Sequence, residues 1–330
     1  MRHDQQHMVR WITAIAAFLG MMFGGVVLAS EGVSPLQPGA TTGNPAGALP
    51  PKGVYLSVDA DYETGKIYND EGRRAKTPTG KHIKATNVSS VAALTWVTGY
   101  KLLGARYAMG IAQPYKWAHT RTSDSTSKQT VNSHGMVNTA FIPVILSWQA
   151  SPSVFIGTGL TIYANNGKFD SSYDSSAGRQ VKDSTTIGNH YWTFEPNFAV
   201  TYLNHGWNIT VNQILDFNTP NSTTEYRSGQ IYYLDLTIAK TIRRMTWGVI
   251  ANYTQQITND EIKGKAVEAV PGFYGKGNKM VHQLIGPMVA YDFGRFSINS
   301  RFLFSVKAKN DANISFFHIG FSLPLSQRKE

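Results

Sequence analysis

The sequence predicts an all-β fold: a transmembrane, antiparallel, up-and-down β-barrel of about twelve strands with both termini in the periplasm. Three observations favour it: segments that alternate apolar and polar residues, connections that alternate between short and long, and tryptophans at segment ends. The alternation is clearest at 191–203, where Trp192 and Tyr202 fall on one parity and Glu195 on the other. At roughly 3.3 Å per residue and a tilt of about 40°, the ten residues from Trp192 to Tyr202 project to roughly 25 Å, the height of a lipid-facing band.

The N-terminus explains how such a chain reaches a membrane. Residues 1–29 combine Arg2 and Arg10 with an apolar run that ends in small residues, which is typical of a secretory signal peptide. A transmembrane anchor is the alternative, because the run is long enough to span a bilayer. The chain has no cysteine, so disulfides and thiolate metal sites are excluded.

Residues 30–52 are rich in Pro, Gly and Ala and have no hydrophobic period, so we expect an extended segment. Two alternatives stay open for it, a periplasmic tail and a plug that folds into the barrel lumen.

The barrel is expected over 53–325, followed by a short polar tail at 326–330. Each strand is expected where apolar and polar residues alternate, and each ends at a turn or a loop. The expected strands are 53–63, 87–98, 101–114, 136–150, 153–164, 189–203, 206–218, 229–241, 245–257, 282–293, 295–307 and 313–325.

The connections alternate in length. Tight turns are expected at Thr98-Gly99-Tyr100, Ser151-Pro152, Asn204-His205-Gly206, Ile242-Arg243-Arg244 and Gly294. Long loops are expected at 64–86, 115–135, 165–188, 219–228 and 258–281, with a shorter one at 308–312. Short turns on one side and long loops on the other are typical of bacterial outer-membrane barrels.

Aromatic residues at the strand ends predict two membrane-interface girdles, because an indole ring is apolar while its N–H requires a partner. The expected girdle residues are Trp96, Trp117, Trp148, Trp192, Tyr202, Trp207, Trp247, Phe293 and Phe296.

Several blocks resemble a known family. GNHYWTFEPNFAVTYL, TTEYRSGQIYYLDL, YTQQITND and LIGPMVAYDF are similar, in order and spacing, to segments of the outer-membrane meta-pathway phenol-degradation family. The resemblance covers about residues 51–325 and excludes the long loops. It implies a twelve-stranded barrel that takes up small hydrophobic, aromatic compounds.

Charged residues on the lumen-facing parity suggest a constriction that sorts solutes by charge. Its expected members are Arg106, Glu195, Asp235 and Arg301. The alternative is an ionic network that only fills and stiffens a narrow lumen.

Apolar residues assigned to the same face suggest a path for an aromatic solute, or simple filling of the interior. They are Phe141, Phe155, Leu284 and Met288. Pro143 and Pro196 lie within strands and cannot donate to the ladder, which favours a local break: a lateral opening or a bulge.

The expected function is therefore passive uptake of small hydrophobic, aromatic compounds through an outer-membrane channel. The alternative is a structural or adhesive barrel with an occluded lumen that acts through its basic loops. The expected partners are the lipid bilayer, lipopolysaccharide, small hydrophobic solutes and the outer-membrane insertion machinery. Despite a net charge of +10, no nucleic acid is expected, and neither are catalysis, a cofactor or a metal.

Overall fold

The computed structural model describes Glu31 and residues 34–327, so the predicted signal peptide at 1–29 lies outside the described residues. Among these residues, no helix is long and apolar enough to cross a membrane.

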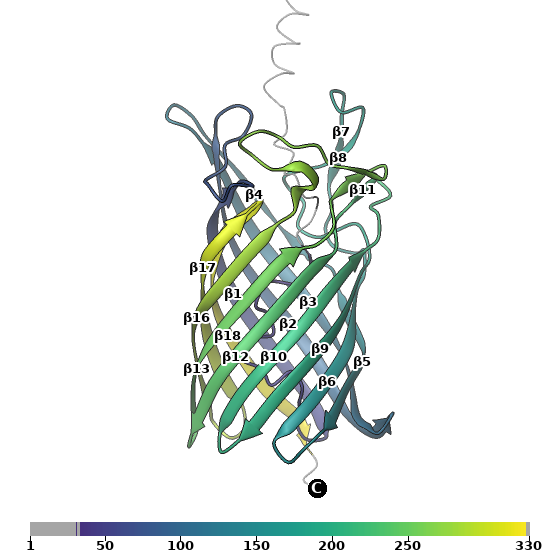
Figure 1. Cartoon of the computed structure of the whole chain (residues 1–330), viewed down its shortest axis with the longest axis vertical. Coiled ribbons are helices and arrows are strands. Elements are labelled where there is room, and N and C mark those ends of the chain that lie inside the picture. The colour runs from purple at the N-terminus through teal and green to yellow at the C-terminus, as the bar shows by residue number, and fades with distance from the viewer. Residues whose placement is uncertain (1–30, 32–33, 328–330) are drawn as a thin grey trace, which may run out of the picture.

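Twelve strands close into one antiparallel barrel (Figure 1). The main sheet has 13 strands; β4 pairs only with β3, which leaves twelve in the ring. These are β1 Gly53–Tyr68, β2 His82–Leu102, β3 Ala105–Ser123, β5 Ala140–Gln149, β6 Val154–Tyr163, β9 Thr193–Asn204, β10 Trp207–Asn218, β12 Ile231–Ile242, β13 Met245–Gln256, β16 Val281–Asp292, β17 Ser297–Lys309 and β18 Asp311–Gln327. The predicted fold class and strand number are confirmed.

The pairing of β1 with β18 closes the ring. It runs from Gly53 opposite Gln327 to Tyr68 opposite Asp311, with one register shift near Val54. Closure leaves no unpaired edge in the lipid, where no water could satisfy it. β18 continues through Gln327, two residues beyond the expected end of the last strand.

Smaller elements gather at the end of the barrel that carries the long loops (Figure 1). β4 (Lys128–Met136) extends β3 outward, and β7 (Ser171–Asp174) pairs with β8 (Arg179–Lys182). A second small sheet and a 3₁₀ turn complete this end: β11 Tyr226–Arg227, β14 Glu261–Ile262, β15 Lys265–Ala266 and η2 Lys276–Asn278. None of these elements was predicted, because their sequences lack a sustained alternation.

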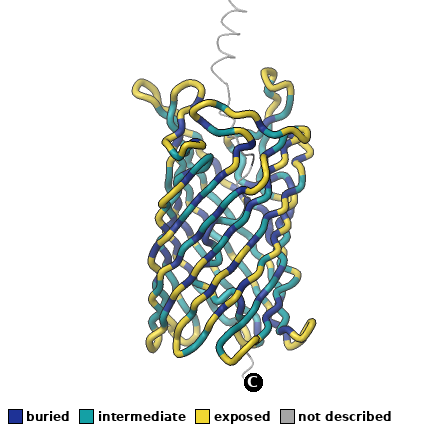
Figure 2. Tube along the Cα trace, viewed as in Figure 1, coloured by how far each residue is buried: buried dark blue, intermediate teal, exposed yellow. Residues whose placement is uncertain are grey.

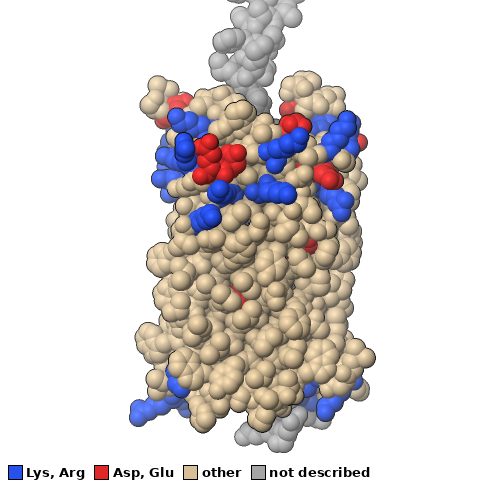
Figure 3. Space-filling view, in the orientation of Figure 1, with Lys and Arg blue, Asp and Glu red and all other residues tan. Residues whose placement is uncertain are grey.

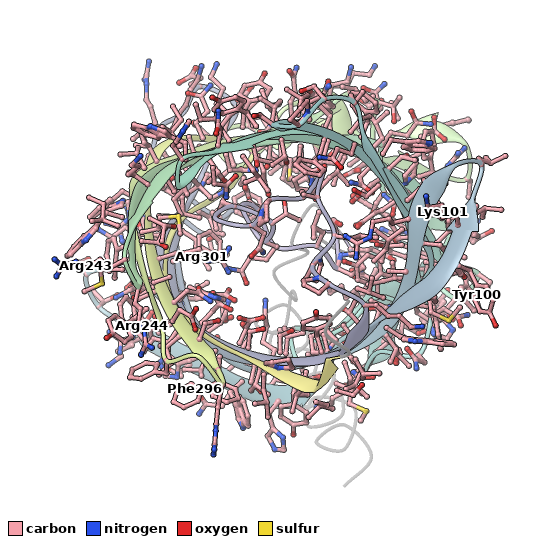
Figure 4. The ribbon with its side chains drawn as sticks, turned by 90° about the horizontal axis from the view of Figure 1, so that it is seen from below. Tyr100, Lys101, Arg243, Arg244, Phe296 and Arg301 are labelled. Atoms are coloured by element: carbon pink, nitrogen blue, oxygen red, sulfur yellow. The ribbon has the colours of Figure 1, made fainter. Side chains whose placement is uncertain are left out.

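The middle of the barrel shows almost no charged side chains on the outward face seen in Figure 3. Buried and exposed residues alternate along the strands (Figure 2), and the exposed parity carries side chains such as Phe198, Leu236 and Val249. Most of the expected girdle residues are exposed: Trp96, Trp117, Trp192, Tyr202, Trp207, Trp247 and Phe293. Trp148 is half-exposed, and the half-exposed Phe296 stacks on Phe293 on the outside of the ring (Figure 4).

One predicted turn is wrong. β2 continues past Gly99 to Leu102, with a register shift between Val97 and Lys101, and the chain reverses at Leu103 and Gly104. Both turn residues have positive φ, 53° and 78°, as a tight hairpin turn requires. Gly99 therefore lies in a strand irregularity, and the leucine before Gly104 gave no turn signal.

The described residues begin and end at opposite ends of the barrel. Glu31 lies among the long loops, against Asn221 and Thr224, whereas Gln327 lies opposite Gly53 at the short-turn end. The periplasmic location of both termini of the full chain stays a prediction.

The lipid-facing assignment can be tested by Leu236→Arg in the middle of β12. A charged side chain at mid-depth should destabilise the barrel and lower its free energy of unfolding in lipid vesicles by about 2–4 kcal/mol. Urea unfolding followed by tryptophan fluorescence measures this change. Thr223→Arg in an exposed loop is the control, and an equal effect of both variants would contradict the assignment.

Candidate functional site

Residues 34–50 run through the barrel lumen, and we refer to them as the plug segment. Figure 4 looks along the barrel and shows this chain inside the ring of strands. The segment starts near the long loops, where Ser34 contacts Glu195, and ends near the short turns, where Leu49 contacts Arg106. It was left open as a tail or a plug in the sequence analysis.

One side of the plug segment is hydrogen-bonded to the wall formed by β9, β10 and β12. The backbone N–H and hydroxyl of Thr41 both donate to Asp235 Oδ2, at 3.1 and 2.6 Å. Lower in the lumen, the N–H of Gly43 donates to Thr237 Oγ1 at 2.8 Å, and the N–H of Gly47 donates to Thr201 Oγ1 at 2.9 Å. Wall side chains thus satisfy plug backbone groups that have no strand partner.

Arg301 of β17 holds the same segment from the other side and points into the lumen (Figure 4). Its Nη1 donates to the carbonyl oxygens of Gly39, Ala40 and Thr42 at 3.3, 3.0 and 2.7 Å. Nη2 lies 2.7 Å from His318 Nε2, and His318 Nδ1 lies 2.9 Å from Asp61 Oδ1. His318 Nε2 also lies 3.1 Å from Asp59 Oδ1, so the imidazole lies between the Arg301 guanidinium and two carboxyl groups.

Glycine lets the plug segment approach the wall closely. Gly39 and Gly43 have φ of +79° and +85°, a region that L side chains rarely adopt. A Cβ on Gly157 of β6 would lie 2.8 Å from the Ala46 carbonyl oxygen. The small residues on the inward parity therefore make room for the plug backbone.

The four expected constriction residues all face the lumen, but they do not form one ring. Glu195 contacts Ser34, Asp235 and Arg301 hold residues 39–42, and Arg106 donates to the carbonyl oxygens of Leu49 and Pro50 at 2.7 and 2.5 Å. The four residues therefore contact the plug segment at three different heights in the lumen. Alternation in sequence gives the direction of a side chain, whereas strand tilt and stagger set its height.

Three of the four residues of the expected apolar path face inward. Leu284 and Met288 are buried in a cluster with Ile250, Leu303 and Phe316, and Phe155 lies on the same parity as Gly157. The assignment of Phe141 is wrong, because its side chain is 44% exposed on the outer surface. The cause is a register shift between Phe141 and Val144, around Pro143, which reverses the alternation within β5.

Pro196, in contrast, keeps the strand register. It lies opposite Leu160 of β6 without a shift, while the pairing of β9 with β10 omits Glu195 and Pro196. The missing donor interrupts one side of the ladder only. The lateral opening considered from the sequence stays a prediction.

A cavity of about 370 Å³ lies between residues 34–40 and the wall opposite β10. Its lining is mixed: Asp59, Asp61, Glu63, Lys116 and His318 are polar, whereas Leu36, Val91, Pro114, Ile314 and Phe316 are apolar. Glu63, 3% exposed as a side chain, is paired with Lys116 at 3.5 Å and accepts from Asn87 and Ser89. The cavity offers apolar surface with a few fixed polar groups, as sites for small molecules do.

Glu31 fastens the outer end of the plug segment to the loops. Its Oε2 accepts from Asn221 Nδ2 at 2.9 Å and from Thr224, its Oε1 lies 3.9 Å from Arg179, and its carbonyl oxygen accepts from Lys182. Burial raises the pKa of Glu31, against the opposing effect of its donors and of Lys182. Burial also lowers the pKa of Lys182 to about 8. We call these five residues the loop clasp.

A histidine and a serine near the long loops have structural contacts. His190 stacks on Phe169 with ring centroids 5.2 Å apart, and Ser228 Oγ lies 3.1 Å from the Tyr191 hydroxyl. Among the described residues, no group of three His, Asp or Glu side chains is arranged to hold a metal.

Comparison with known proteins identifies a family and a fold. The family described as "Putative MetA-pathway of phenol degradation" matches residues 69–315. The COG4313 outer membrane channel from Pseudomonas putida F1 is similar in structure, with a TM-score of 0.63, 12% identity, and coverage of 87% of this chain and 99% of that chain.

Two further solved structures match less well. The β domain of the Bordetella autotransporter BrkA has a TM-score of 0.46 at 10% identity and covers 84% of this chain and 100% of its own. A TodX monoaromatic hydrocarbon channel mutant has a TM-score of 0.43 at 11% identity, and the match covers 86% of this chain and 93% of that chain. No curated protein matches the sequence significantly.

The hold of Arg301 on the plug segment can be tested by Arg301→Ala. Breaking this buried network should weaken docking of the segment by about 3–5 kcal/mol and raise single-channel conductance severalfold. Planar-bilayer recordings measure the conductance, with Arg243→Ala on the outside of the barrel as the control (Figure 4). Equal conductance of the two variants would show that Arg301 does not keep the lumen closed.

The loop clasp predicts a pH dependence. The pKa of Glu31 is raised above its ordinary 4.5 in the docked state, so docking is strongest at low pH and weakens as pH rises through the raised pKa. Glu31→Gln keeps the hydrogen-bonding shape and should abolish this dependence. Hydrogen exchange of residues 34–38, corrected for intrinsic rates, measures it. Glu225→Gln, which removes an exposed ion pair with Lys263, should retain the dependence shown by the unmodified protein.

Proposed function

The chain belongs to the MetA-pathway phenol-degradation family, and we propose that it is an outer-membrane channel for passive uptake of small hydrophobic, aromatic compounds. The barrel has the fold of an outer-membrane channel, and its apolar outer band fits a lipid bilayer (Figure 3). Hydrophobic solutes and membrane lipid are its partners under this proposal.

The observation that carries the proposal is a lumen crossed by the plug segment, with a cavity of mixed lining beside that segment. Among the described residues, the plug segment narrows the lumen, so an ion that passed beside it would lose part of its hydration, at a cost of several kcal/mol where no charged group replaces it. An aromatic solute loses little on leaving water. The cavity of about 370 Å³ offers such a solute apolar lining, including Leu36, Val91 and Phe316.

The loops support a second candidate, an adhesive or structural barrel that acts through its basic outer end. Lysines and arginines gather above the apolar band (Figure 3), and the first long loop carries Lys76 and Lys81. These cations suit contact with lipopolysaccharide phosphates. The alternating apolar parity of β18 likewise suits recognition by the outer-membrane insertion machinery.

Deletion of the gene distinguishes the two candidates. Uptake of several radiolabelled single-ring aromatic compounds, measured at low external concentration, should fall several-fold in the deletion strain and return on complementation. At high concentration, direct permeation through the lipid should hide the difference.

The contrary result is equally definite. Unchanged uptake across the whole panel, together with loss of cell-surface binding, would favour the adhesive barrel. Arg73→Ala, at an exposed loop residue that pairs with Glu71, serves as a control because it should leave uptake unchanged.

A further inference from the structure

Residues 34–36 of the plug segment occupy a pocket near the outer end of the lumen. We call it the Ser34 pocket. It is formed by Tyr163, Ile214, Glu195, Asp216, Ile231, Tyr233 and Met280, which come from β6, β9, β10, β12 and the residue before β16. Its two ends have opposite chemistry.

The polar end accepts hydroxyl groups. Ser34 Oγ donates to Glu195 Oε1 at 3.3 Å while it accepts from the N–H of Leu36 at 3.0 Å. The Tyr233 hydroxyl lies 3.4 Å from Asp216 Oδ2, and Tyr163 hydrogen-bonds to Glu195. Every side-chain donor identified for the two carboxyls, apart from the carboxyls themselves, is therefore a hydroxyl.

The two carboxyls have spare capacity to accept. Glu195 is 3% exposed and Asp216 is fully buried. Among the described residues, the groups that act on them include neither lysine nor arginine, and Asp216 Oδ1 has no donor apart from the neighbouring Glu195. A buried acceptor that lacks a cation is stabilised by a neutral O–H donor.

The apolar end is occupied by a leucine. Leu36 packs against the buried cluster of Ile214, Ile231, Tyr233 and Met280. The plug segment therefore presents one hydroxyl and, two residues further on, one compact apolar group to the pocket.

The Ser34 pocket adjoins the cavity. Ser34, Leu36 and Tyr163 line the cavity as well as the pocket. A solute in the cavity therefore lies directly beside residues 34–36, which fill the pocket. An apolar cavity of about 150 Å³ holds benzene, so a single-ring solute fits the space of about 370 Å³ that is already present.

We propose that the Ser34 pocket is a solute-binding site of the channel, and that it selects neutral, single-ring aromatic molecules that carry a hydroxyl group. The solute hydroxyl takes the place of Ser34 Oγ at Glu195, and the ring takes the place of Leu36. This rests on the proposed function as a channel and adds a solute class to it. In the closed channel, residues 34–36 compete with the solute for the same groups.

The selectivity follows from what each solute leaves unpaired. A phenol that displaces Ser34 restores the hydrogen bond to Glu195, whereas toluene leaves the buried carboxyl without that donor. A site that hydrogen-bonds a hydroxyl rejects an analogue that lacks it more strongly than an apolar pocket rejects an added group. An anionic benzoate would be repelled, because two carboxyls that share one proton still carry a negative charge.

The test compares phenol with toluene in a strain that lacks the gene and carries each variant. Glu195→Met keeps the side-chain volume and removes the acceptor, so the ratio of phenol to toluene uptake should fall about tenfold, the equivalent of one hydrogen bond. Thr201→Val is the matched control, because it removes a wall contact with Gly47 far from the pocket. It should change both uptakes alike and preserve their ratio.

A second variant lies on the plug segment, where it cannot disturb the barrel wall. Ser34→Ala removes the competing hydroxyl, so phenol uptake should rise severalfold relative to toluene uptake. Heat-modifiable migration shows whether Glu195→Met reaches the outer membrane. If it does not, the Ser34→Ala variant alone tests whether the pocket binds the solute hydroxyl.

The outcomes separate the two proposals. If neither solute depends on the channel, the proposed function fails. If both depend on it and the phenol-to-toluene ratio is unchanged in Glu195→Met or, where that variant does not insert, in Ser34→Ala, the channel stands and the assignment of the Ser34 pocket is overturned.

Discussion

The structure depends on one constraint: every backbone N–H and C=O within the lipid must be paired inside the protein. Pairing of β1 with β18 meets it for the wall. Closure in turn fixes which parity faces inward, and it brings Asp61, Glu195, Asp235 and Arg301 into a narrow lumen. These groups then need partners of their own. The composition of the lumen is therefore a consequence of closure.

The plug segment supplies those partners with its backbone and with the uncharged side chains of Ser34, Gln37 and Thr41. Its carbonyl groups accept from Arg301 and its N–H groups donate to Asp235 and Thr237, so inward charges are satisfied without charged residues on the described part of the plug segment. The expectation of an extended segment was wrong: residues 37–48 form a series of turns in which Ala40, Thr42 and Ala48 donate to carbonyl groups of the same segment. Glycine suits these turns because it accepts positive φ and adds no bulk against the wall. Where residues 34–40 do not meet the opposite wall, the cavity remains.

Alternation in the sequence was sufficient to predict the twelve strands, the outward aromatic residues and the inward direction of Arg301 and Glu195, because a period of two sets direction alone. It could not give heights within the barrel, so the four charged residues were placed in one constriction. Phe141 was misplaced because a bulge at Pro143 shifts the period locally. The plug was undecided because its hydrogen bonds involve backbone groups, which every sequence possesses. The loop clasp and His318 contacts join residues far apart in the chain, and spacing carries no signal for such pairs.

The attachments of the plug segment determine how a solute can enter without releasing it. Glu31 is held by the loop clasp, and Gly39 to Thr42 are held by Arg301 and Asp235. Between these anchors, the contacts with the wall are side-chain hydrogen bonds of Ser34 and Gln37 and the apolar contact of Leu36. Such contacts are each worth about 1–3 kcal/mol, less than a buried charge network. A solute that supplies an equivalent hydroxyl and apolar surface replaces those of Ser34 and Leu36 at little net cost. Under the proposed function, entry thus needs a local exchange at residues 34–36, while the contacts of Arg301 with residues 39–42 stay in place.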